Sequence, residues 1–448
     1  MVKKIDGGIL AAKGYSVASK CCGIKGKSNK RDLTLIKSDS PATVVGTFTR
    51  NIVKAAPVKW DMEVCARGAA SAIVINTGIA NAATGMQGYE NCRREAEVVA
   101  EALSLSADEV LTMSTGVIGP QLPMDKIEDG IRELARELTG VPYYGTEVLR
   151  EYFSGAKANA YMEANEAAKA IMTTDTHPKE IAVSFTLGGK ECHIGAMCKG
   201  SGMIHPNMGT MLGFLLSDIS IDRELAESML RAVVERTFNM VSVDGDTSTN
   251  DTVVWLTNGL AGNELLTAEG LGITGEIDES GDTDISSLGS SEDYKELYEA
   301  LYTVCEYLAK NIAKDGEGAT RLFTAKVVGA PDYKTAKTLA KSIITSNLTK
   351  AAIYGRDANC GRIFCAMGYS GAKFNPEKVD IVMSSSAGSI KMIDKGTLPV
   401  FSEEEALAIL TPDEITAVCD LHDGTAEATA WGCDLTHEYV TINADYRS

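Results

Sequence analysis

Apolar and polar positions along the chain follow two periods, one typical of strands and one typical of helices. Short β-rich runs at 43–49, 72–76 and 109–114 are predicted to be strands. Segments with apolar residues three or four positions apart, at 88–103 and 125–138, are predicted to be helices. This alternation predicts an α/β (α+β layered) protein in which helices cover sheets.

The second half of the chain continues the alternation. The elements predicted there are a hairpin with arms at 181–187 and 191–197, an apolar strand at 211–216, and helices at 223–237 and 294–312. The stretch 272–293 is rich in Gly, Ser, Asp and Glu, and it is predicted to be a solvated surface insertion.

Composition narrows the class of protein. The chain has 448 residues, of which 44% are hydrophobic and 23% are charged, so it can bury a large core like an ordinary globular protein. Its formal net charge of -18 disfavours nucleic acid as a partner, because a phosphate backbone needs a concentrated basic surface. Small molecules are therefore the expected partners.

Several other classes of site are disfavoured by what the sequence lacks. No run of eighteen apolar residues occurs and the start has no long apolar region, so a cytoplasmic protein without a membrane partner is expected. The eleven cysteines include no C-x-x-C pair, which predicts buried free thiols. The five histidines lack metal-ligand spacing, so no metal is expected.

One segment carries candidate chemistry. The residues KGSGMIHPNMGTML at 199–212 present the Thr210 hydroxyl after a glycine-rich loop and before an apolar strand. Gly209 lacks a Cβ and permits a strained peptide, in which that hydroxyl could attack the preceding carbonyl. Hydrolysis of the resulting ester would free an α-amine of pKa roughly 7.7 to 8.0, a base for its own side chain. On the local residues alone, an ordinary threonine between loop and strand is the commoner interpretation.

The same segment resembles the cleavage segment of ornithine acetyltransferases, the ArgJ family, in which alanine usually precedes the threonine. Further segments resemble this family in the same order along the chain. They are TFTRN at 47–51, APV at 56–58, NTGIAN at 76–81, STGVIG at 114–119, MTTDT at 172–176, VDGDTSTND at 243–251, DGEGAT at 315–320 and INADYRS at 442–448. The resemblance therefore covers nearly the whole chain.

The resemblance implies an ArgJ/DmpA-like fold of the self-cleaved, N-terminal-nucleophile type. One precursor would cut itself between Gly209 and Thr210. The fragments 1–209 (alpha chain) and 210–448 (beta chain) would stay entwined, and the family precedent is a heterotetramer of two alpha and two beta chains.

The resemblance also implies roles for single residues. Thr210 is the expected nucleophile, and Thr115 and Gly116 match the family's oxyanion hole. The positions that match the family's substrate contacts are Thr173, Lys199, Thr210, Glu317, Asn443 and Ser448. We expect Lys199 to face a carboxylate, and Glu317 with Asn443 to receive the ammonium group of ornithine.

The implied reaction moves an acetyl group from N-acetylornithine to glutamate through an acetyl-threonine intermediate. This recycles acetyl groups in arginine biosynthesis and needs no cofactor, although some family members also take the acetyl group from acetyl-CoA.

The sequence departs from the family pattern at four positions. Gly209 replaces the usual alanine, and Ser448 replaces a terminal threonine but keeps its hydroxyl. Ile79 stands where asparagine is common. Cys360, in ANCGR at 358–362, stands where the family has tryptophan, which empties a large volume and could alter the preference for acceptor or acyl donor.

Two other functions remain open at this point. Water could capture the acyl-threonine, giving an N-terminal-threonine amidohydrolase or aminopeptidase, which would release acetate with or without glutamate. Alternatively, the chain could be an uncleaved homologue that binds an amino acid without turnover, and it would then stay a single polypeptide.

Overall fold

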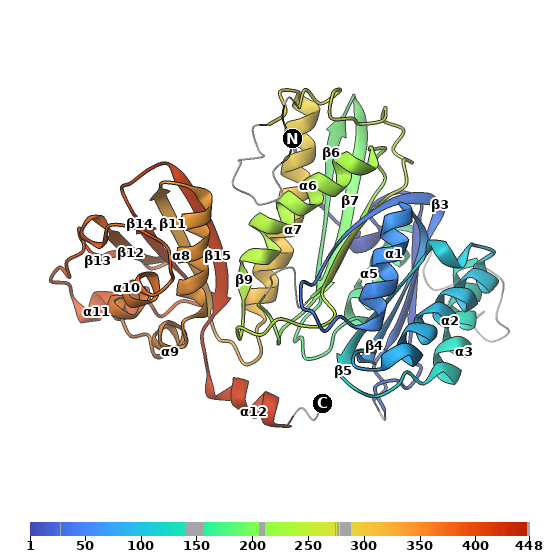
Figure 1. Ribbon diagram of the computed structural model, residues 1–448, viewed down its shortest axis with the longest axis horizontal. Helices are drawn as coiled ribbons and strands as arrows, with labels where there is room; N and C mark the ends of the chain where they lie inside the picture. Colours follow the sequence, from blue (N-terminus) through green and yellow to red (C-terminus); the bar gives the residue numbers. More distant parts are fainter. Residues whose placement is uncertain are drawn as a thin grey trace.

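The computed structural model describes residues 1–26, 28–139, 156–205, 211–273, 275, 277 and 288–445, with the side chains of 156–161 left aside. Two sheets lie beside each other, and helices pack on and between them (Figure 1). The mixed α/β class predicted from the alternating periods is therefore confirmed.

The larger sheet has nine strands in the order β1-β6-β7-β8-β10-β3-β4-β5, and β2 pairs with β3. Their bounds are β1 Lys3–Ile5, β2 Tyr15–Lys20, β3 Leu33–Phe48, β4 Ala69–Ile79, β5 Val110–Val117, β6 Lys179–Leu187, β7 Lys190–Lys199, β8 Leu212–Ser217 and β10 Thr252–Thr257. β8 and β10 pair in parallel, and so do β4 and β5. Because β8 and β10 lie between β7 and β3, segments on both sides of the expected cut share one sheet.

The predicted strands and the hairpin are all present. The strand predicted at 43–49 is the second part of the sixteen-residue β3, whose register with β4 shifts between Lys37 and Ala42. Pro41, which cannot donate to a ladder, lies in that interval. The hairpin β6-β7 turns at Gly188 and Gly189, both with positive φ.

The central strands are buried on both faces. In β8 and β10, Leu215 and Trp255 pack on one face, whereas Phe214 and Val254 pack on the other. Successive side chains of a strand point to opposite faces, so each strand contributes to two cores. This is why 211–216 is a continuous apolar run rather than an alternating one.

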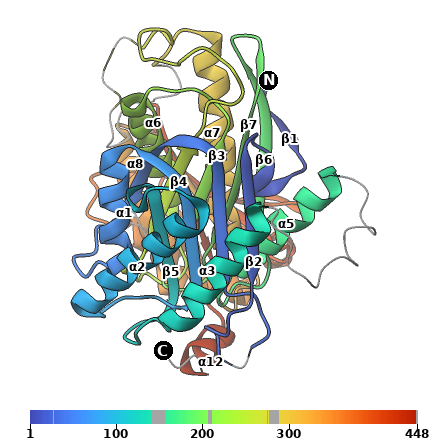
Figure 2. The same ribbon diagram turned by 90° about the vertical axis from the view of Figure 1, so that its right-hand side faces the viewer.

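Helices cover the two faces of the larger sheet. One group comprises α1 Ala56–Arg67, α2 Gly85–Leu103, α3 Met124–Thr139 and α5 Ala156–Ala170, and the other comprises α6 Arg223–Arg236 and α7 Glu292–Lys314. Figure 2 shows α1, α2 and α3 together on one side of the strands. The predicted helices at 88–103, 125–138, 223–237 and 294–312 are confirmed as α2, α3, α6 and α7.

Capping residues set the ends of several of these helices. The Asp222 carboxylate accepts from the backbone of Glu224 and Leu225 at the start of α6, and Ser291 Oγ accepts from Tyr294 N at the start of α7. At the end of α1, Gly68 adopts the left-handed conformation that favours glycine.

The smaller sheet has six strands in the order β13-β12-β14-β11-β15-β9. Their bounds are β9 Val241–Ser242, β11 Leu322–Ala330, β12 Asp380–Ser385, β13 Gly388–Ile393, β14 Glu414–Asp420 and β15 Ala426–Cys433. The helices of this region are α8 Tyr333–Thr345, α9 Asn347–Gly355, α10 Cys360–Gly368, α11 Glu403–Ile409 and α12 His437–Asp445. None of these elements was predicted from the sequence. α7 contacts both sheets, so the core beneath it is continuous between them.

Other expectations fall partly outside the described residues. Most of the predicted insertion 272–293 lies outside them; within it, Ile273 and Gly289 form an isolated bridge. Eight of the eleven cysteines are buried and all eleven are free thiols, as predicted. In the ranges described, no helix is long and apolar enough to cross a membrane, and no cluster of three metal-ligating side chains occurs.

Candidate active site

The ends of β5 and β7 bring two of the predicted site residues into contact. Lys199, the last residue of β7, is buried, and its ammonium donates to Thr115 Oγ1 over 3.2 Å. Thr115 is itself buried near the end of β5. Thr115 and Lys199 are 84 positions apart in the chain. Their strands β5 and β7 are not neighbours in the sheet, so this contact does not follow from strand pairing.

Gly116, next to Thr115, occupies a position that only glycine fits. Its φ is +132°, and a Cβ there would lie 2.3 Å from the carbonyl carbon of Gly78 on β4. The register of β4 against β5 shifts at this point, between Gly78 and Ile79. The close approach of the two backbones therefore fixes the position of Gly116.

Asparagine side chains hold the strand ends behind Thr115. Asn76 Nδ2 donates to the Ile79 carbonyl over 2.9 Å, and Ser114 Oγ donates to Asn76 Oδ1 over 2.5 Å. Asn250 Nδ2 donates to the carbonyls of Ala80 and Ser114, over 2.7 and 2.8 Å. Ile79 enters this network only through its carbonyl, so its departure from the family's asparagine leaves these bonds intact.

A buried ion network lies beside Lys199. The Lys179 ammonium contacts Asp175 Oδ1 at 2.7 Å and Asp315 Oδ2 at 2.5 Å. Asp175 also accepts from the backbone N–H groups of Gly200 and Thr173, over 2.7 and 3.0 Å. The network thus fixes both Thr173 and the loop that follows Lys199.

Charge explains the state of the Asp175 carboxyl. Burial acts to raise its pKa, but the ammonium groups of Lys179 and Lys199, with the hydrogen bonds, lower that pKa below its ordinary value. Asp175 and Asp315 lie in family-like segments of the sequence. No signal in the sequence could have identified Lys179.

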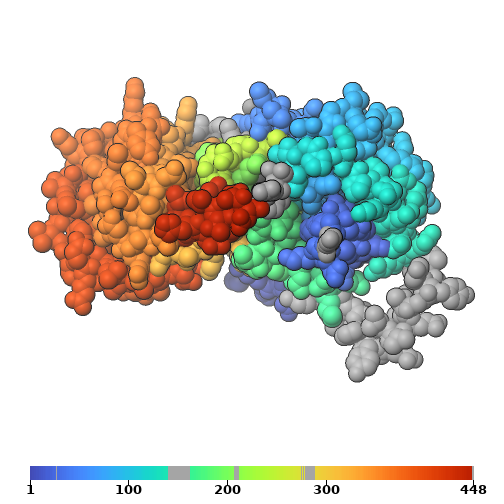
Figure 3. Space-filling model, turned by 90° about the horizontal axis from the view of Figure 1, so that it is seen from below, coloured from blue at the N-terminus to red at the C-terminus, as the bar shows by residue number. Residues whose placement is uncertain are grey.

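Glu317 and Asn443 meet on the other side of the same loop. Asn443 Nδ2 donates to Glu317 Oε2 over 2.8 Å, and Glu317 N donates to the Ser201 carbonyl over 2.9 Å. The Glu317 carboxylate lies against the backbone of Gly202, within 2.3 Å of where a Cβ would be. Asn443 comes from α12, which crosses the junction between the two parts of the molecule (Figure 3).

Lys199 is surrounded by carboxylates. Burial lowers the pKa of its ammonium, while Asp175, Asp251 and Glu317 act to raise it. The structure therefore brings Lys199 together with Thr115, Thr173 and Glu317, which the sequence could place only by resemblance.

Asp251 also lies at this site, although the sequence did not predict it as a site residue. It is 2% exposed, and neither carboxylate oxygen makes a hydrogen bond of ordinary geometry with a described residue. Burial raises its pKa well above the ordinary value. The Thr49 hydroxyl, the Lys199 ammonium and the Met211 N–H nevertheless approach it closely enough to act against the rise of its pKa. Thr252 N donates to the Met211 carbonyl over 3.0 Å, so Asp251 lies level with Met211 on the neighbouring strand. Its only sequence signal is its place at the end of the family-like segment 243–251.

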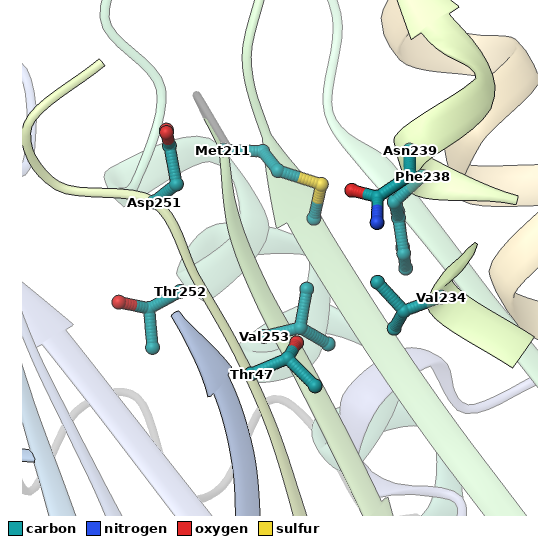
Figure 4. A pocket seen from close by; sticks show the side chains of 8 residues that line it. All are labelled: Thr47, Met211, Val234, Phe238, Asn239, Asp251, Thr252 and Val253. Atoms are coloured by element: carbon teal, nitrogen blue, oxygen red, sulfur yellow. The ribbon is translucent and has the colours of Figure 1, made fainter. Parts of the chain in front are cut away.

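A small cavity borders Asp251 (Figure 4). It has about 10 Å³ and is lined by Thr47, Met211, Val234, Phe238, Asn239, Asp251, Thr252 and Val253. A space of that size is about the minimum that holds one water molecule.

Three predicted residues cannot be placed. Gly209 and Thr210, which define the expected cut and nucleophile, lie outside the described residues, and so does Ser448. Met211 and His205 are the described residues that flank the segment containing the expected cut.

The departure at Cys360 lies in the region of the smaller sheet. Cys360 is buried at the start of α10 and borders a cavity of about 10 Å³, together with Ile363 and Met383. Little space for water is therefore left beside Cys360 in this cavity.

Comparison with known proteins gives full-length matches. The ArgJ family model matches residues 16–448. The arginine biosynthesis bifunctional protein ArgJ of Thermotoga neapolitana is 42% identical over 98% of this chain and 100% of its own length. The protein ArgJ 1 of Clostridium acetobutylicum is 45% identical over 97% of this chain and 96% of its own.

A solved structure is also similar. The ornithine acetyltransferase of Mycobacterium tuberculosis, complexed with ornithine, is 36% identical over 46% of this chain and 99% of that chain, with a TM-score of 0.39. On the family model and the full-length relatives, the chain belongs to the ArgJ family.

Proposed function

We propose that this protein moves an acetyl group from N-acetylornithine to glutamate through an acetyl-threonine on Thr210, after cutting itself between Gly209 and Thr210. Membership of the ArgJ family makes it an acyltransferase of arginine biosynthesis with an ornithine acetyltransferase role. The observation that carries the finer proposal is the contact between Lys199 and Thr115, with Glu317 and Asn443 beside the same loop.

The contact prepares the Thr115 hydroxyl to act as a donor. Because the Lys199 ammonium donates to Thr115 Oγ1, the hydroxyl proton remains available for an oxyanion. With the Gly116 N–H as a second donor, the pair would stabilise a tetrahedral intermediate. One such donor is typically worth about 2.7 to 4 kcal/mol.

The proposed transfer has two steps. Thr210 Oγ forms a bond to the acetyl carbon of N-acetylornithine, and the bond from that carbon to the ornithine nitrogen breaks. The α-amine of Thr210 takes the hydroxyl proton and passes it to the leaving amine. The amine of glutamate then bonds to the acetyl carbon, and the bond from that carbon to the threonine oxygen breaks. The same α-amine carries a proton from the attacking glutamate nitrogen to the threonine oxygen, which restores the hydroxyl.

Charge supports the assignment of the substrates. The Glu317 carboxylate, oriented by Asn443, suits the ammonium of ornithine, and Lys199 suits a substrate carboxylate. The reaction needs no cofactor, because threonine itself carries the acetyl group. The proposal includes acetyl-CoA as a second acetyl donor and a heterotetramer of two alpha and two beta chains.

The first test is the intact mass of the denatured protein beside Thr210→Ala. The wild type should give two fragments that meet at Gly209 and Thr210, and the variant should give one full-length chain. Thr338→Ala, which removes a hydroxyl from the outer helix α8, is the matched control and should be cut like the wild type. A single uncut chain in every sample would refute the nucleophile and favour an amino-acid-binding homologue.

Product analysis then separates transfer from hydrolysis. The proposal expects N-acetylglutamate when glutamate is present and little free acetate when it is absent. Equal release of acetate with and without glutamate would instead identify an amidohydrolase.

A further inference from the structure

A cleft lies at the end of β3, and neither Glu317 nor Asn443 lines it. It has about 300 Å³ and is formed by the end of β3, the loop after it, α1 and α6. Its lining residues are Gly46, Thr47, Phe48, Thr49, Arg50, Lys54, Met62, Arg231 and Glu235. This volume is at the lower end of the range typical of small-molecule sites.

The cleft is cationic on a protein whose net charge is -18. Arg50 and Lys54, from the loop after β3, and Arg231, from α6, contribute three positive charges, and Glu235 is the one acidic side chain among the described residues that line the cleft. The Glu235 carboxylate accepts hydrogen bonds from Lys337 and Asn239, which do not line the cleft. The Lys337 ammonium therefore balances its negative charge.

The surroundings of Lys337 show how closely the cations are gathered. Burial and the nearby Arg50 guanidinium lower the pKa of the Lys337 ammonium. Arg231 pairs with Glu227 on the same helix, whereas the Lys54 ammonium donates to the Asn51 carbonyl, over 3.0 Å. Like charges this close favour an anion that can neutralise several of them.

The inner end of the cleft is polar as well. Thr47 lines both this cleft and the small cavity beside Asp251 and Met211. Thr47 is 4% exposed, and its hydroxyl has no hydrogen-bond partner within the described ranges. A buried hydroxyl without a partner is costly, which makes it a contact that a ligand could satisfy.

We propose that this cleft is a second ligand site, which takes an organic anion bearing at least two negative charges. Arg50 and Lys54 bind its phosphate or carboxylate groups, and Thr47 contacts its inner end. The volume exceeds that of an inorganic ion, and Met62 and Phe48 offer apolar surface to the organic part. The proposal does not depend on cleavage or on acetyl transfer, because binding is measured directly.

The test is calorimetric titration of the full chain with inorganic pyrophosphate and, separately, with tricarballylate, a polycarboxylate that lacks the amine of the proposed acetyl acceptor. We expect at least one of them to bind, and binding at least about a hundredfold weaker to the double variant with Arg50→Gln and Lys54→Gln, because that variant removes two charged hydrogen bonds to the anion. Binding of pyrophosphate alone would identify a phosphate-bearing ligand, and binding of tricarballylate would identify a polycarboxylate.

The control removes a charge close to the cleft but outside it. Lys59→Gln replaces an exposed lysine of α1 that does not line the cleft, and it should bind like the wild type. Thermal unfolding of each variant checks that the fold is retained. If neither anion binds at millimolar concentration, or if the control weakens binding as much as the double variant, the proposal is refuted.

Discussion

Two buried carboxyl groups near Lys199, those of Asp175 and Asp251, have opposite surroundings. Asp175 contacts the Lys179 ammonium and accepts from two backbone N–H groups, and its pKa is lowered. Asp251 makes no hydrogen bond of ordinary geometry with a described residue, and burial raises its pKa despite the nearby Thr49 hydroxyl and Met211 N–H. Both act on the same Lys199 ammonium.

The difference indicates that one carboxyl group supports the fold and that the other is available for chemistry at the same site. A buried charge with all its partners holds backbone segments in place, as Asp175 holds the residues around Thr173 and Gly200. A buried carboxyl without partners costs stability, and such costs gather where a protein has a function to perform. Asp251 lies level with Met211, the residue that follows the expected nucleophile Thr210, which fits this explanation.

The largest expected effect comes from breaking the satisfied network. Lys179→Met would leave Asp175 and Asp315 buried without their shared cation. The free energy of unfolding, measured with urea, should fall by about 3–5 kcal/mol. The control Lys391→Met removes an exposed lysine that also pairs with two aspartates, and it should cost less than about 1 kcal/mol. Equal losses of unfolding free energy in both variants would show that the buried network stabilises the fold no more than an exposed ion pair does.

Smaller changes in the free energy of unfolding, of opposite sign, are expected when each of the two carboxyl groups is replaced by an amide. The raised pKa of Asp251 means that the fold favours its protonated form, so stability falls as pH rises from below about 3.8. Asp251→Asn should therefore be more stable than the wild type at pH 7, by about 1–3 kcal/mol, and this gain should vanish near pH 3.5.

Asp175→Asn is the matched variant. Because the pKa of Asp175 is lowered, its carboxylate contributes stability that is present above about pH 4 and lost in acid. The variant should be less stable than the wild type at pH 7, with the loss shrinking as pH falls. Urea unfolding at pH 7, 5 and 3.5 checks both signs, and parallel pH profiles for the two variants would contradict the contrast.

The smallest effect concerns hydroxyl groups. Thr47→Val replaces a buried hydroxyl that lacks a partner in the described chain with a methyl of similar size, and it should raise the thermal midpoint by about 2 °C. Thr176→Val removes a hydroxyl that donates to Asp315 and should lower the midpoint. A lower midpoint for Thr47→Val would show that its hydroxyl is satisfied in the folded protein.

Local patterns in the sequence were sufficient for part of the fold. The helices α2, α3, α6 and α7 were predicted because apolar residues recur with a period of about 3.6 within each of these segments. The hairpin β6-β7 was predicted because Gly188 and Gly189 mark its turn. The smaller sheet was missed because its central strand β11 pairs with β14 and β15, which come much later in the chain, so only packing of the whole chain brings them together.

The candidate site shows the same division. The sequence by itself determined which residues match the ArgJ family, including Thr115, Lys199 and Glu317, because those matches need only the order of residues along the chain. Only the tertiary structure decided that Lys199 reaches Thr115, that Lys179 joins two aspartates, and that Asp251 is buried without a hydrogen bond of ordinary geometry in the described chain. Contacts between strands far apart in sequence, and the loss of water around a charge, arise only when the whole chain packs, so no local pattern encodes them.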